Sequence, residues 1–334
     1  MNIGIAFDLK ADFLSQKPAD APDDLFEEYD SVGTVDAIQR ALESRGHTVS
    51  RLGGGRRFLA RMLEAAPALV FNISEGHGSR SREAHVPAVC EMLGVPCTHS
   101  DPLTMAVTLD KAMAKRVVAS AGVPTPRFVV LEELRDMERV ELPFPLFAKP
   151  LFEGSSMGIR KRSRIEDRAQ LRERAGQLLH DYAEPVLIEE FCGGAEFTVG
   201  LLGNGERSRV IAAMEVEPLL VPRTEFVYSL EVKRNPDWAD EIAYNVPPKR
   251  PRAEVERIEK VALDAYRALG CRDIARIDVR CDTAGDPKFI ECNPLPGIAP
   301  GWSDLAILWE RIGKSYDELV LAVLDEACAR ARLP

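Results

Sequence analysis

The sequence lacks long hydrophobic runs, and none of its apolar stretches approaches the length that a membrane-spanning helix requires. Its start is typical of a strand rather than of a signal peptide. Long basic blocks are absent too, and 53 acidic against 43 basic residues give a net charge of −10. We therefore expect a cytoplasmic protein whose main partner is neither a membrane nor nucleic acid, although a locally basic cleft would still admit a nucleotide.

Cysteine and histidine patterns that hold metals or disulfides are also missing. The seven cysteines are scattered through apolar surroundings without a C-x-x-C pair, and the five histidines do not cluster at ligand spacing. We interpret the cysteines as reduced residues of a cytosolic core. The G-x-x-x-x-G-K spacing of a P-loop is absent, so a phosphate site in this chain must be built in another way.

Strands and helices alternate through the first hundred residues. The predicted strands span residues 2–7, 48–52, 69–73 and 95–98, and the predicted helices span 34–44 and 83–93. This order indicates a parallel α/β domain in a chain of 334 residues that has room for two or three domains. Polar residues and glycines, Glu75 among them, crowd the end of the strand at 69–73. Ligands bind at such strand ends in open α/β sheets, so this stretch is either a substrate-binding loop or an ordinary connection.

A helix is predicted after Thr108, its expected N-cap, and it ends at Gly122 before two prolines. We place the boundary between the first and second domains at this helix. Its Lys111 is either an ordinary solvated lysine or a phosphate ligand.

A buried lysine and a glycine–serine loop follow one another in the second domain. The strand predicted at 144–150 contains Lys149, and burying a lysine is costly unless it is paired or faces a ligand. The loop Glu153-Gly154-Ser155-Ser156 comes next, and its small residues let backbone N–H groups approach an anion. We interpret the two together as a phosphate cradle. The charged run at 160–174 is predicted to be a solvated helix face.

The strand predicted at 186–190 ends in two acids and leads into residues 191–196, which end at Glu196. Apolar side chains there could sandwich a base, while an acid accepts ribose hydroxyls. Antiparallel strands are expected at 197–202 and 210–216. The proline-rich stretch 218–251 is either a lid or a passive surface excursion. Helices are expected at residues 254–269, 304–312 and 316–330.

The strongest chemical pattern lies near the C-terminal end, where alternating strands of a hairpin are predicted at 274–280 and 288–293. The hairpin brings these polar side chains to one face: Arg276, Asp278, Glu291 and Asn293. Two carboxylates and an amide oxygen suit Mg²⁺ that also binds nucleotide phosphates, and the arginine could stabilise a developing oxyanion. A solvated hairpin with charges at every second position is the alternative.

Three motifs in these segments occur in order and at matching separations: Lys149-Pro150 through Glu153-Gly154-Ser155-Ser156, Glu189 to Glu196-Phe197-Thr198-Val199, and Arg276-Ile277-Asp278 to Glu291-Cys292-Asn293 with Pro296-Gly297. Together they resemble ATP-grasp ligases, most closely the D-alanine–D-alanine ligase family. The likeness covers residues 101–334 well and the first hundred residues more loosely. It implies an ATP-grasp fold of α/β and α+β class with an N-terminal parallel α/β (pre-ATP-grasp) domain. The implied domains are an N-terminal substrate domain at 1–107, a central ATP-grasp subdomain at 108–199 and a C-terminal catalytic domain at 200–334.

The resemblance also implies a role for each matching residue. The ATP-binding residues are Lys111 and Lys149 at the phosphates, Ser155 and Ser156 in the loop over them, Glu189 near the adenine and Glu196 at the ribose. Two Mg²⁺ ions, for which Mn²⁺ could substitute, are bound by Asp278, Glu291 and Asn293. The catalytic residues are Arg276 and the backbone N–H of Gly297 at the oxyanion site, together with Ser155 and Lys233.

The implied reaction has two steps. ATP phosphorylates a carboxylate to an acyl phosphate, and an amine then attacks the acyl carbon and releases phosphate. Charge must be neutralised in the first step, and an anionic tetrahedral centre must be stabilised in the second. The implied substrates are two amino acids, with D-alanine as the default for both, as in peptidoglycan synthesis. Members of the family are often homodimers through the first domain.

The sequence departs from the family pattern in the half that binds amino acids. The glycine-rich turn after the first strand reads Phe7-Asp8-Leu9-Lys10, and the nearest acids, Glu27 and Glu28, follow a long insertion. Leu230 and Arg234 stand where the lid pattern has tyrosines. The substrate residues that we expect are Glu28, Glu75, Tyr228 and Ser303. Two alternatives stay open: a related ligase that joins other amino acids or amines in specialised metabolism, and a nucleotide-binding protein without turnover.

Overall fold

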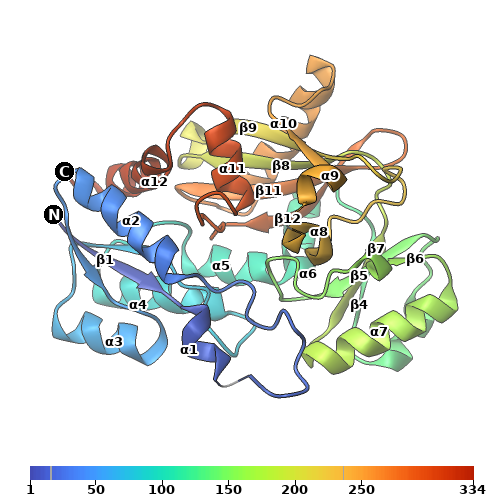
Figure 1. Cartoon of the computed structure of the whole chain (residues 1–334), viewed down its shortest axis with the longest axis horizontal. Helices are drawn as coiled ribbons and strands as arrows, with labels where there is room; N and C mark the ends of the chain where they lie inside the picture. Colours follow the sequence, from blue (N-terminus) through green and yellow to red (C-terminus); the bar gives the residue numbers. More distant parts are fainter. Residues whose placement is uncertain (16, 236) are drawn as a thin grey trace.

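The computed structural model describes residues 1–15, 17–235 and 237–334, and three sheets form the framework of this part of the chain (Figure 1). A parallel sheet lies in the N-terminal unit, a four-stranded antiparallel sheet in the central unit, and a five-stranded antiparallel sheet in the C-terminal unit. This mixture confirms the predicted α/β and α+β class. Among the described residues, no helix has the length and apolar character that crossing a bilayer would need.

The N-terminal unit is a parallel sheet with helices on both faces. Strand β1 pairs in parallel with β2 and β3, as the alternation of strands and helices predicts. Ile5 faces α2 and the C-terminal helix α12, whereas its neighbour Ala6 faces α3 and α4. The last helix therefore covers one face of the N-terminal sheet. Both chain ends lie on one side of the molecule (Figure 1). The elements are β1 (Asn2–Phe7), α1 (Lys10–Leu14), α2 (Val32–Ser44), β2 (Thr48–Arg51), α3 (Gly55–Glu64), β3 (Leu69–Ile73), α4 (His85–Leu93) and α5 (Pro102–Leu109).

The central unit is an antiparallel sheet in the order β4-β7-β5-β6, with α7 on one face. Strand alternation buries Leu146 and Ala148 against α7. The intervening Phe147 and Lys149 therefore point to the opposite face, toward the C-terminal sheet. The elements are α6 (Lys111–Ser120), which leads into this unit, β4 (Phe128–Leu131), β5 (Leu146–Pro150), β6 (Arg164–Ile165), α7 (Arg168–Tyr182) and β7 (Val186–Glu190).

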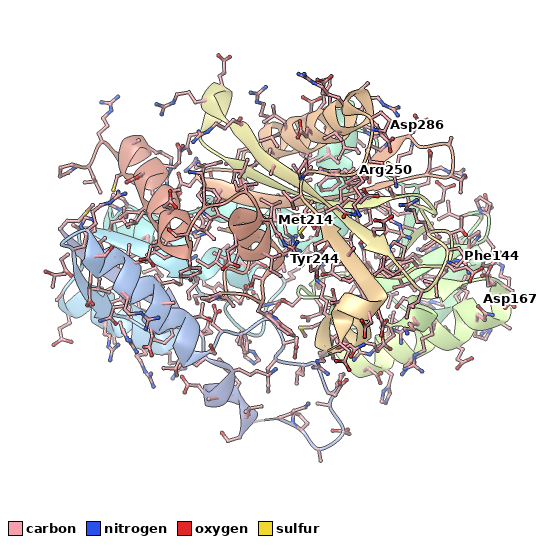
Figure 2. The ribbon with its side chains drawn as sticks, turned by 45° about the horizontal axis from the view of Figure 1, so that its top comes forward. Phe144, Asp167, Met214, Tyr244, Arg250 and Asp286 are labelled. Atoms are coloured by element: carbon pink, nitrogen blue, oxygen red, sulfur yellow. The ribbon has the colours of Figure 1, made fainter. Side chains whose placement is uncertain are left out.

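The C-terminal unit is an antiparallel sheet in the order β10-β9-β8-β11-β12. Helices α6 and α10 pack against one face, and α11 packs against the other. Met214 on β9 and Tyr244 on β10 belong to the core of the second face (Figure 2). The elements are β8 (Glu196–Leu202), β9 (Arg209–Pro218), α8 (Leu230–Arg234), α9 (Trp238–Glu241), β10 (Ile242–Asn245), α10 (Arg252–Ala268), β11 (Ile274–Cys281), β12 (Pro287–Asn293), α11 (Asp304–Arg311) and α12 (Tyr316–Ala331).

Several local predictions were wrong. Thr108 lies inside α5, and the N-cap of α6 is Asp110, whose carboxylate accepts a hydrogen bond from the Met113 N–H at 3.0 Å. Within the described residues, 95–98 do not form a strand and instead contribute a single parallel bridge, between Cys97 and Val70 of β3. The charged run at 160–174 is not one helix, because β6 interrupts it and α7 starts only after the Asp167 cap.

Two other segments hold more regular structure than predicted. Helix α3 follows the glycine turn at 53–55, where no helix was expected. The proline-rich stretch 218–251 contains α8, α9 and β10, and β10 pairs with β9. The expected boundary between residues 199 and 200 falls inside β8, whose pairing with β9 and β11 makes it part of the C-terminal sheet. The division at 107 and 108 stays a prediction.

Candidate active site

Two adjoining cavities lie where the three units meet. The intersheet pocket, about 720 Å³ including its mouth, has these residues among its lining: Phe147, Lys149, Phe191, Glu196 and Asp278. The acidic cavity, about 1160 Å³ including its mouth, is lined on one side by Glu27, Glu28, Glu75 and Glu83. Both are large enough for small-molecule ligands. The two cavities share five lining residues, which we call the junction: Tyr228, Lys233, Arg276, Glu291 and Asp304.

The predicted hairpin of β11 and β12 is confirmed, and it supplies the floor of the junction. Arg276 lies opposite Asn293, and Asp278 lies opposite Glu291 in the antiparallel register. One residue pair therefore follows the other on the same face of the sheet. The Arg276 Nη2 atom donates to Asp278 Oδ2 at 3.0 Å, and the Thr198 hydroxyl donates to Oδ1 at 3.0 Å. Both carboxylate oxygens of Asp278 are thus already oriented.

The oxygen donors on this hairpin fit a magnesium ion that is shared with phosphates. The Asn293 Nδ2 atom lies 3.4 Å from Asp278 Oδ2, so a turned amide would present its oxygen to the same place. The set contains only two carboxylates, Asp278 and Glu291. No group of three or more His, Cys, Asp or Glu side chains suited to a metal occurs in the described ranges. The remaining coordination positions would need phosphate or water oxygens, which is the usual way that Mg²⁺ is bound.

Cations surround the Glu291 carboxylate. Lys149 Nζ lies 3.5 Å from Oε2. Although burial opposes ionisation, Lys149, Lys111 and other nearby cations hold the pKa of Glu291 at about 2. Burial and the Glu291 charge act the other way on Asp278 and raise the pKa of that carboxyl. Of the two carboxylates that face each other on the hairpin, Glu291 is therefore the one that is held ionised.

Glu189 is buried between two lysines, on the face of the central sheet that points into the intersheet pocket. Lys115 Nζ is 2.8 Å from Oε2 and Lys149 Nζ is 3.0 Å from Oε1. Burial and Lys149 lower the pKa of Lys115, whereas Glu189 and Glu291 outweigh burial and raise the pKa of Lys149 to about 12. Because both oxygens face lysines, the carboxylate holds Lys149 in place at the pocket wall.

The glycine–serine loop after β5 adopts a strained backbone. Ser155 and Ser156 have φ angles of 48° and 60°, a region that residues with a side chain seldom occupy. Such strain is found at ligand-binding loops that the surrounding structure holds in place. The Lys111 ammonium donates to the backbone carbonyl of Glu153 at the start of this loop. The predicted phosphate residues are therefore brought together beside the junction.

Glu196 lines the intersheet pocket. Arg280 Nη1 is 3.1 Å from Glu196 Oε2, and the Arg280 guanidinium also stands over the Phe191 ring at 4.5 Å. The Phe191 ring is stacked at 6.2 Å from Phe147. An aromatic wall beside a charged carboxylate is the combination that a nucleoside requires.

Two of the predicted substrate residues, Glu28 and Glu75, line the acidic cavity, and they differ in their partners. Glu28 is paired with Arg82, whose Nε and Nη2 atoms donate to its two oxygens at 3.1 Å each. Glu75 lines the same cavity, and burial together with Glu83 and Glu28 raises its pKa well above the usual value. Burial and Glu28 also raise the pKa of Glu83, to about 7.

The other two predicted substrate residues also line this cavity. Tyr228 donates its hydroxyl to Asp304 Oδ1 at 2.9 Å and carries the Lys233 ammonium over its ring at 4.5 Å. The Ser303 hydroxyl accepts a hydrogen bond from the Ala299 N–H at 3.0 Å. A Cβ atom at Gly297 would lie 2.9 Å from Ser303 Oγ, so a side chain at 297 would displace the Ser303 hydroxyl from its present position. Gly297 is exposed and lines the acidic cavity.

Comparison with known proteins decides the family. The family model for the D-ala D-ala ligase C-terminus matches residues 117–325. An uncharacterised protein of Sinorhizobium fredii, y4sG, is 33% identical over 311 residues, which cover 89% of this chain and 88% of that protein. The D-alanine–D-alanine ligase of Bordetella avium is 32% identical over 299 residues, which cover 89% and 90%. The chain belongs to the D-alanine–D-alanine ligase family.

Solved structures show the same fold. The Bacillus anthracis D-alanine–D-alanine ligase, solved in complex with ATP, superposes with a TM-score of 0.73 at 18% identity and covers 99% of this chain and 98% of its own. The VanG D-Ala:D-Ser ligase of Enterococcus faecalis gives a TM-score of 0.72 at 20% identity, with 98% and 99% covered. As a member of the D-alanine–D-alanine ligase family, the chain is an ATP-dependent ligase that forms dipeptides.

Sequence reasoning missed several charged residues that contact the predicted site residues. Asp304 at the start of α11 contacts three junction residues, and Lys115 and Arg280 support two of the predicted ATP residues. Lys115 lies one helical turn after Lys111, and this spacing alone could have suggested it. Asp304 follows Ser303 in an ordinary helix start, so no local signal distinguishes it from an N-terminal helix acid.

Proposed function

We propose that the enzyme phosphorylates the carboxyl group of one amino acid with ATP and joins it to the amine of a second, with D-alanine as the default for both. The observation that carries this proposal is the junction, where cations and carboxylates lie between two ligand-sized cavities. A nucleotide in the intersheet pocket and amino acids in the acidic cavity would meet there. The relatives named as D-alanine–D-alanine ligases support D-alanine as the default.

The nucleotide residues act by charge and position. We assign Lys149, Lys111 and the backbone N–H groups at Ser155 and Ser156 to the ATP phosphates, because they converge beside the junction. We assign Glu196 to the ribose hydroxyls. The adenine is placed against the Phe191 side of the intersheet pocket. The resemblance places Glu189 near the adenine, and the two lysines that hold it support a positioning role for it.

Asp278, Glu291 and Asn293 would hold Mg²⁺, or Mn²⁺ in its place, and the bound ions supply neutralisation of phosphate charge during transfer. In the first step a substrate carboxylate oxygen bonds to the γ-phosphorus while the bond to the ADP oxygen breaks, leaving an acyl phosphate and ADP. Lys233, 3.4 Å from Asp304 at the junction, neutralises charge on the transferring group.

The second step forms the peptide bond. The neutral amine of the second amino acid attacks the acyl carbon, and the carbonyl electron pair moves to oxygen. The Arg276 guanidinium and the Gly297 N–H stabilise this oxyanion. Its collapse expels phosphate, and the nitrogen loses a proton. We assign the ammonium and carboxylate groups of the amino acids to four residues: Glu28, Glu75, Tyr228 and Ser303. All four line the acidic cavity, which supports this assignment.

A phosphate-release assay tests the proposal. The protein is supplied with ATP, Mg²⁺ and D- or L-amino acids, singly and in pairs, and products are identified by mass spectrometry. We expect phosphate release with D-alanine and a D-alanyl-D-alanine product. Absence of release with every amino acid would refute the ligase reaction, whereas release only with other amino acids would refute the default substrates. The homodimer and the cytoplasmic location stay predictions.

The acidic cavity favours a second candidate, a ligase of the same chemistry whose substrate carries an additional ammonium group. Within the described residues, Glu75 and Glu83 have no hydrogen-bond or ion-pair partner, although both line the cavity. Burying like charges without a partner is unfavourable, and the raised pKa values of both carboxyls reflect this. A second substrate ammonium would stabilise their ionised forms.

Diamino acids of either chirality decide between the two candidates in the same assay. The second candidate predicts a higher kcat/KM with a diamino acid than with alanine, and a loss of about tenfold on Glu83→Gln for the diamino substrate alone. A higher kcat/KM with alanine than with every diamino acid tested, measured on the wild-type enzyme, would rule out the second candidate.

A further inference from the structure

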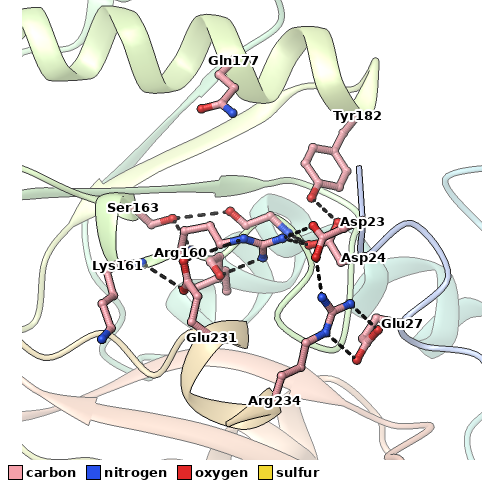
Figure 3. Close-up of polar contacts among 12 residues, drawn as sticks. Asp23, Asp24, Glu27, Arg160, Lys161, Ser163, Gln177, Tyr182, Glu231 and Arg234 are labelled. Carbon is pink, nitrogen blue, oxygen red and sulfur yellow. Dashed lines mark hydrogen bonds and ion pairs between the residues drawn. The ribbon is translucent and has the colours of Figure 1, made fainter. Parts of the chain in front are cut away.

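Two departures from the family pattern meet at one place in the fold. The inserted segment, residues 17–30, bonds to the central unit on one side and to α8 on the other (Figure 3). Helix α8 carries Arg234, which stands in the place of a lid tyrosine. Two acids of the inserted segment, Asp23 and Glu27, are the partners of this arginine, so the inserted segment and α8 are joined here.

Asp24 anchors the inserted segment to the central unit. Its side chain is 0% exposed and accepts hydrogen bonds from the Gly158 N–H at 3.0 Å and the Tyr182 hydroxyl at 2.7 Å. Arg160 Nη2 lies 2.9 Å from Asp24 Oδ2. A buried carboxylate with three donors is held firmly, because losing any of them would leave a buried charge short of a partner.

Arg234 joins the other side of the inserted segment to α8. Its Nε and Nη2 atoms donate to the two oxygens of Glu27 at 3.2 Å and 2.7 Å, and its Nη1 atom donates to Asp23 (Figure 3). Despite partial burial, Arg234 and Lys10 lower the pKa of Glu27, which keeps this carboxylate ionised at neutral pH. The bidentate geometry makes Glu27 the principal partner of Arg234.

The two sides of the inserted segment hold the two segments that enclose the nucleotide. Gly158, bound by Asp24, follows the strained pair Ser155 and Ser156 in the phosphate loop. Arg234 directly follows Lys233, which reaches the junction. The phosphate loop and α8 also contact each other through the Leu230 N–H, which donates to the Ile159 carbonyl at 3.2 Å.

The strengths of the two sides differ. Arg234 is 34% exposed, and its partners Glu27 and Asp23 are 12% and 66% exposed, so water reaches these ion pairs and weakens them relative to a fully buried set. The buried Asp24 contacts are the stronger set. When the site opens, the contacts of Arg234 should therefore break first, while the inserted segment stays on the central unit.

We propose that the inserted segment is an ionic clamp in which Arg234 positions α8, and with it Lys233, over the bound nucleotide. The proposal rests on the assignment of Lys233 and the serine loop to the nucleotide. Arg234 makes no direct contact with the reacting atoms in this role. It favours the closed arrangement, and the apparent affinity for a nucleotide depends on the fraction of molecules in that arrangement.

A double-mutant cycle with a non-hydrolysable ATP analogue and Mg²⁺ tests the clamp. The variants are Arg234→Met, Glu27→Gln and the double variant, and the measurements are the analogue's dissociation constant and dissociation rate. We expect each single change to raise the dissociation constant about fivefold through faster dissociation, and the double change to add little more. Binding is measured without amino acids, so failure of the ligase reaction would not affect the result.

Arg252→Met provides the matched control, because Arg252 is 92% exposed on α10 and, among the residues that the structure describes, pairs with Glu256 alone. It should leave analogue binding unchanged, and its combination with Arg234→Met should show only the effect of the latter. Thermal unfolding midpoints should stay close to that of the wild type for all variants. The proposal would be overturned if Arg234→Met bound the analogue as the wild type does. It would also be overturned if the dissociation constant of the double variant rose by the product of the two single increases, or if a loss of global stability accounted for the weaker binding.

Discussion

Asp304 Oδ2 lies 3.7 Å from Arg276 Nη1, whereas Asp278 accepts a hydrogen bond from Nη2 of the same guanidinium. Asp304 and Arg276 come from different elements, the start of α11 and the middle of β11. Although burial opposes it, Lys233 and Arg276 lower the pKa of Asp304, so this carboxylate stays ionised at neutral pH. Asp304 therefore orients two cations of the junction at once.

Replacing Asp304 by asparagine should reduce kcat by about tenfold or more, since Arg276 and Lys233 lose a counter-charge that fixes their positions. ATP affinity should change less, because Asp304 lies at the inner edge of the intersheet pocket. Steady-state phosphate release and equilibrium binding of an ATP analogue measure the two effects. Asp286→Asn, at the exposed hairpin turn seen in Figure 2, serves as the control and should alter neither. Wild-type turnover in Asp304→Asn would remove Asp304 from the catalytic arrangement.

Arg276 and Arg280 lie on the same strand and should differ in effect. Arg276→Ala should reduce kcat by about 10²–10³-fold with little change in ATP binding, because its charge acts on the oxyanion. Arg280→Ala should mainly weaken ATP binding, because Arg280 positions Glu196 and stacks on Phe191. Kinetics and analogue binding measured on both variants provide the comparison. Equal losses of turnover and binding in Arg276→Ala would contradict its assigned role.

Glu291→Gln should raise the Mg²⁺ concentration that gives half-maximal activity by about tenfold or more, since a neutral amide is a weaker ligand for a hard cation. A magnesium titration at saturating ATP measures this shift. Glu256→Gln, which changes an exposed acid of α10, should leave the titration where it is. The assignment of Glu291 to the metal fails if its variant shows the wild-type titration at reduced activity.

Glu189→Gln should destabilise the fold by about 3–5 kcal/mol at pH 7, because it leaves the buried Lys115 and Lys149 without their shared carboxylate. Urea unfolding measures the loss. The adjacent Glu190→Gln is the matched control, and its loss should be far smaller because its partner Arg127 is exposed.

The pH dependence of stability gives a second test of this lysine–carboxylate cluster. Burial opposes ionisation of Glu189, but Lys115 and Lys149 hold its pKa below the usual 4.5. A group whose folded pKa is depressed stabilises the protein above its unfolded pKa, and this contribution disappears as the pH falls through the folded pKa. The wild type should therefore lose stability below about pH 4.5 more steeply than Glu189→Gln. Parallel pH profiles would show that the cluster is not coupled to folding.

Local patterns in the sequence were sufficient where a repeat decides which way a side chain points. The hairpin is the clearest case, because alternation along 274–280 and 288–293 places Arg276 and Asp278 on one face regardless of the rest of the fold. The same alternation places Lys149 on the face of β5 opposite the core of the central unit, and the expectation that this lysine is paired or faces a ligand agrees with its contacts to Glu189 and Glu291. The nucleotide motifs were recognisable for a related reason, since each occupies one strand end or one loop.

Local patterns failed where two signals compete or where packing selects the outcome. Thr108 and Asp110 are both acceptable helix caps, and the end of α5 decides between them. The run at 160–174 looked like one solvated helix, yet Arg174 is buried and donates to the Gly158 carbonyl. No local pattern predicted that Glu28, which lines the acidic cavity, is also paired with Arg82 from another part of the chain.

The amino-acid sequence by itself determined the strand faces, the glycine–serine loop and the family of this ligase, because these depend on residues that are neighbours along the chain. The tertiary structure alone decided that Asp304 holds Arg276 and that Asp24 and Glu27 tie the inserted segment to Gly158, after the glycine–serine loop, and to α8. Such pairs join residues that are remote in sequence. Their contact depends on how three separate units pack, and no periodic pattern within a single segment specifies that packing.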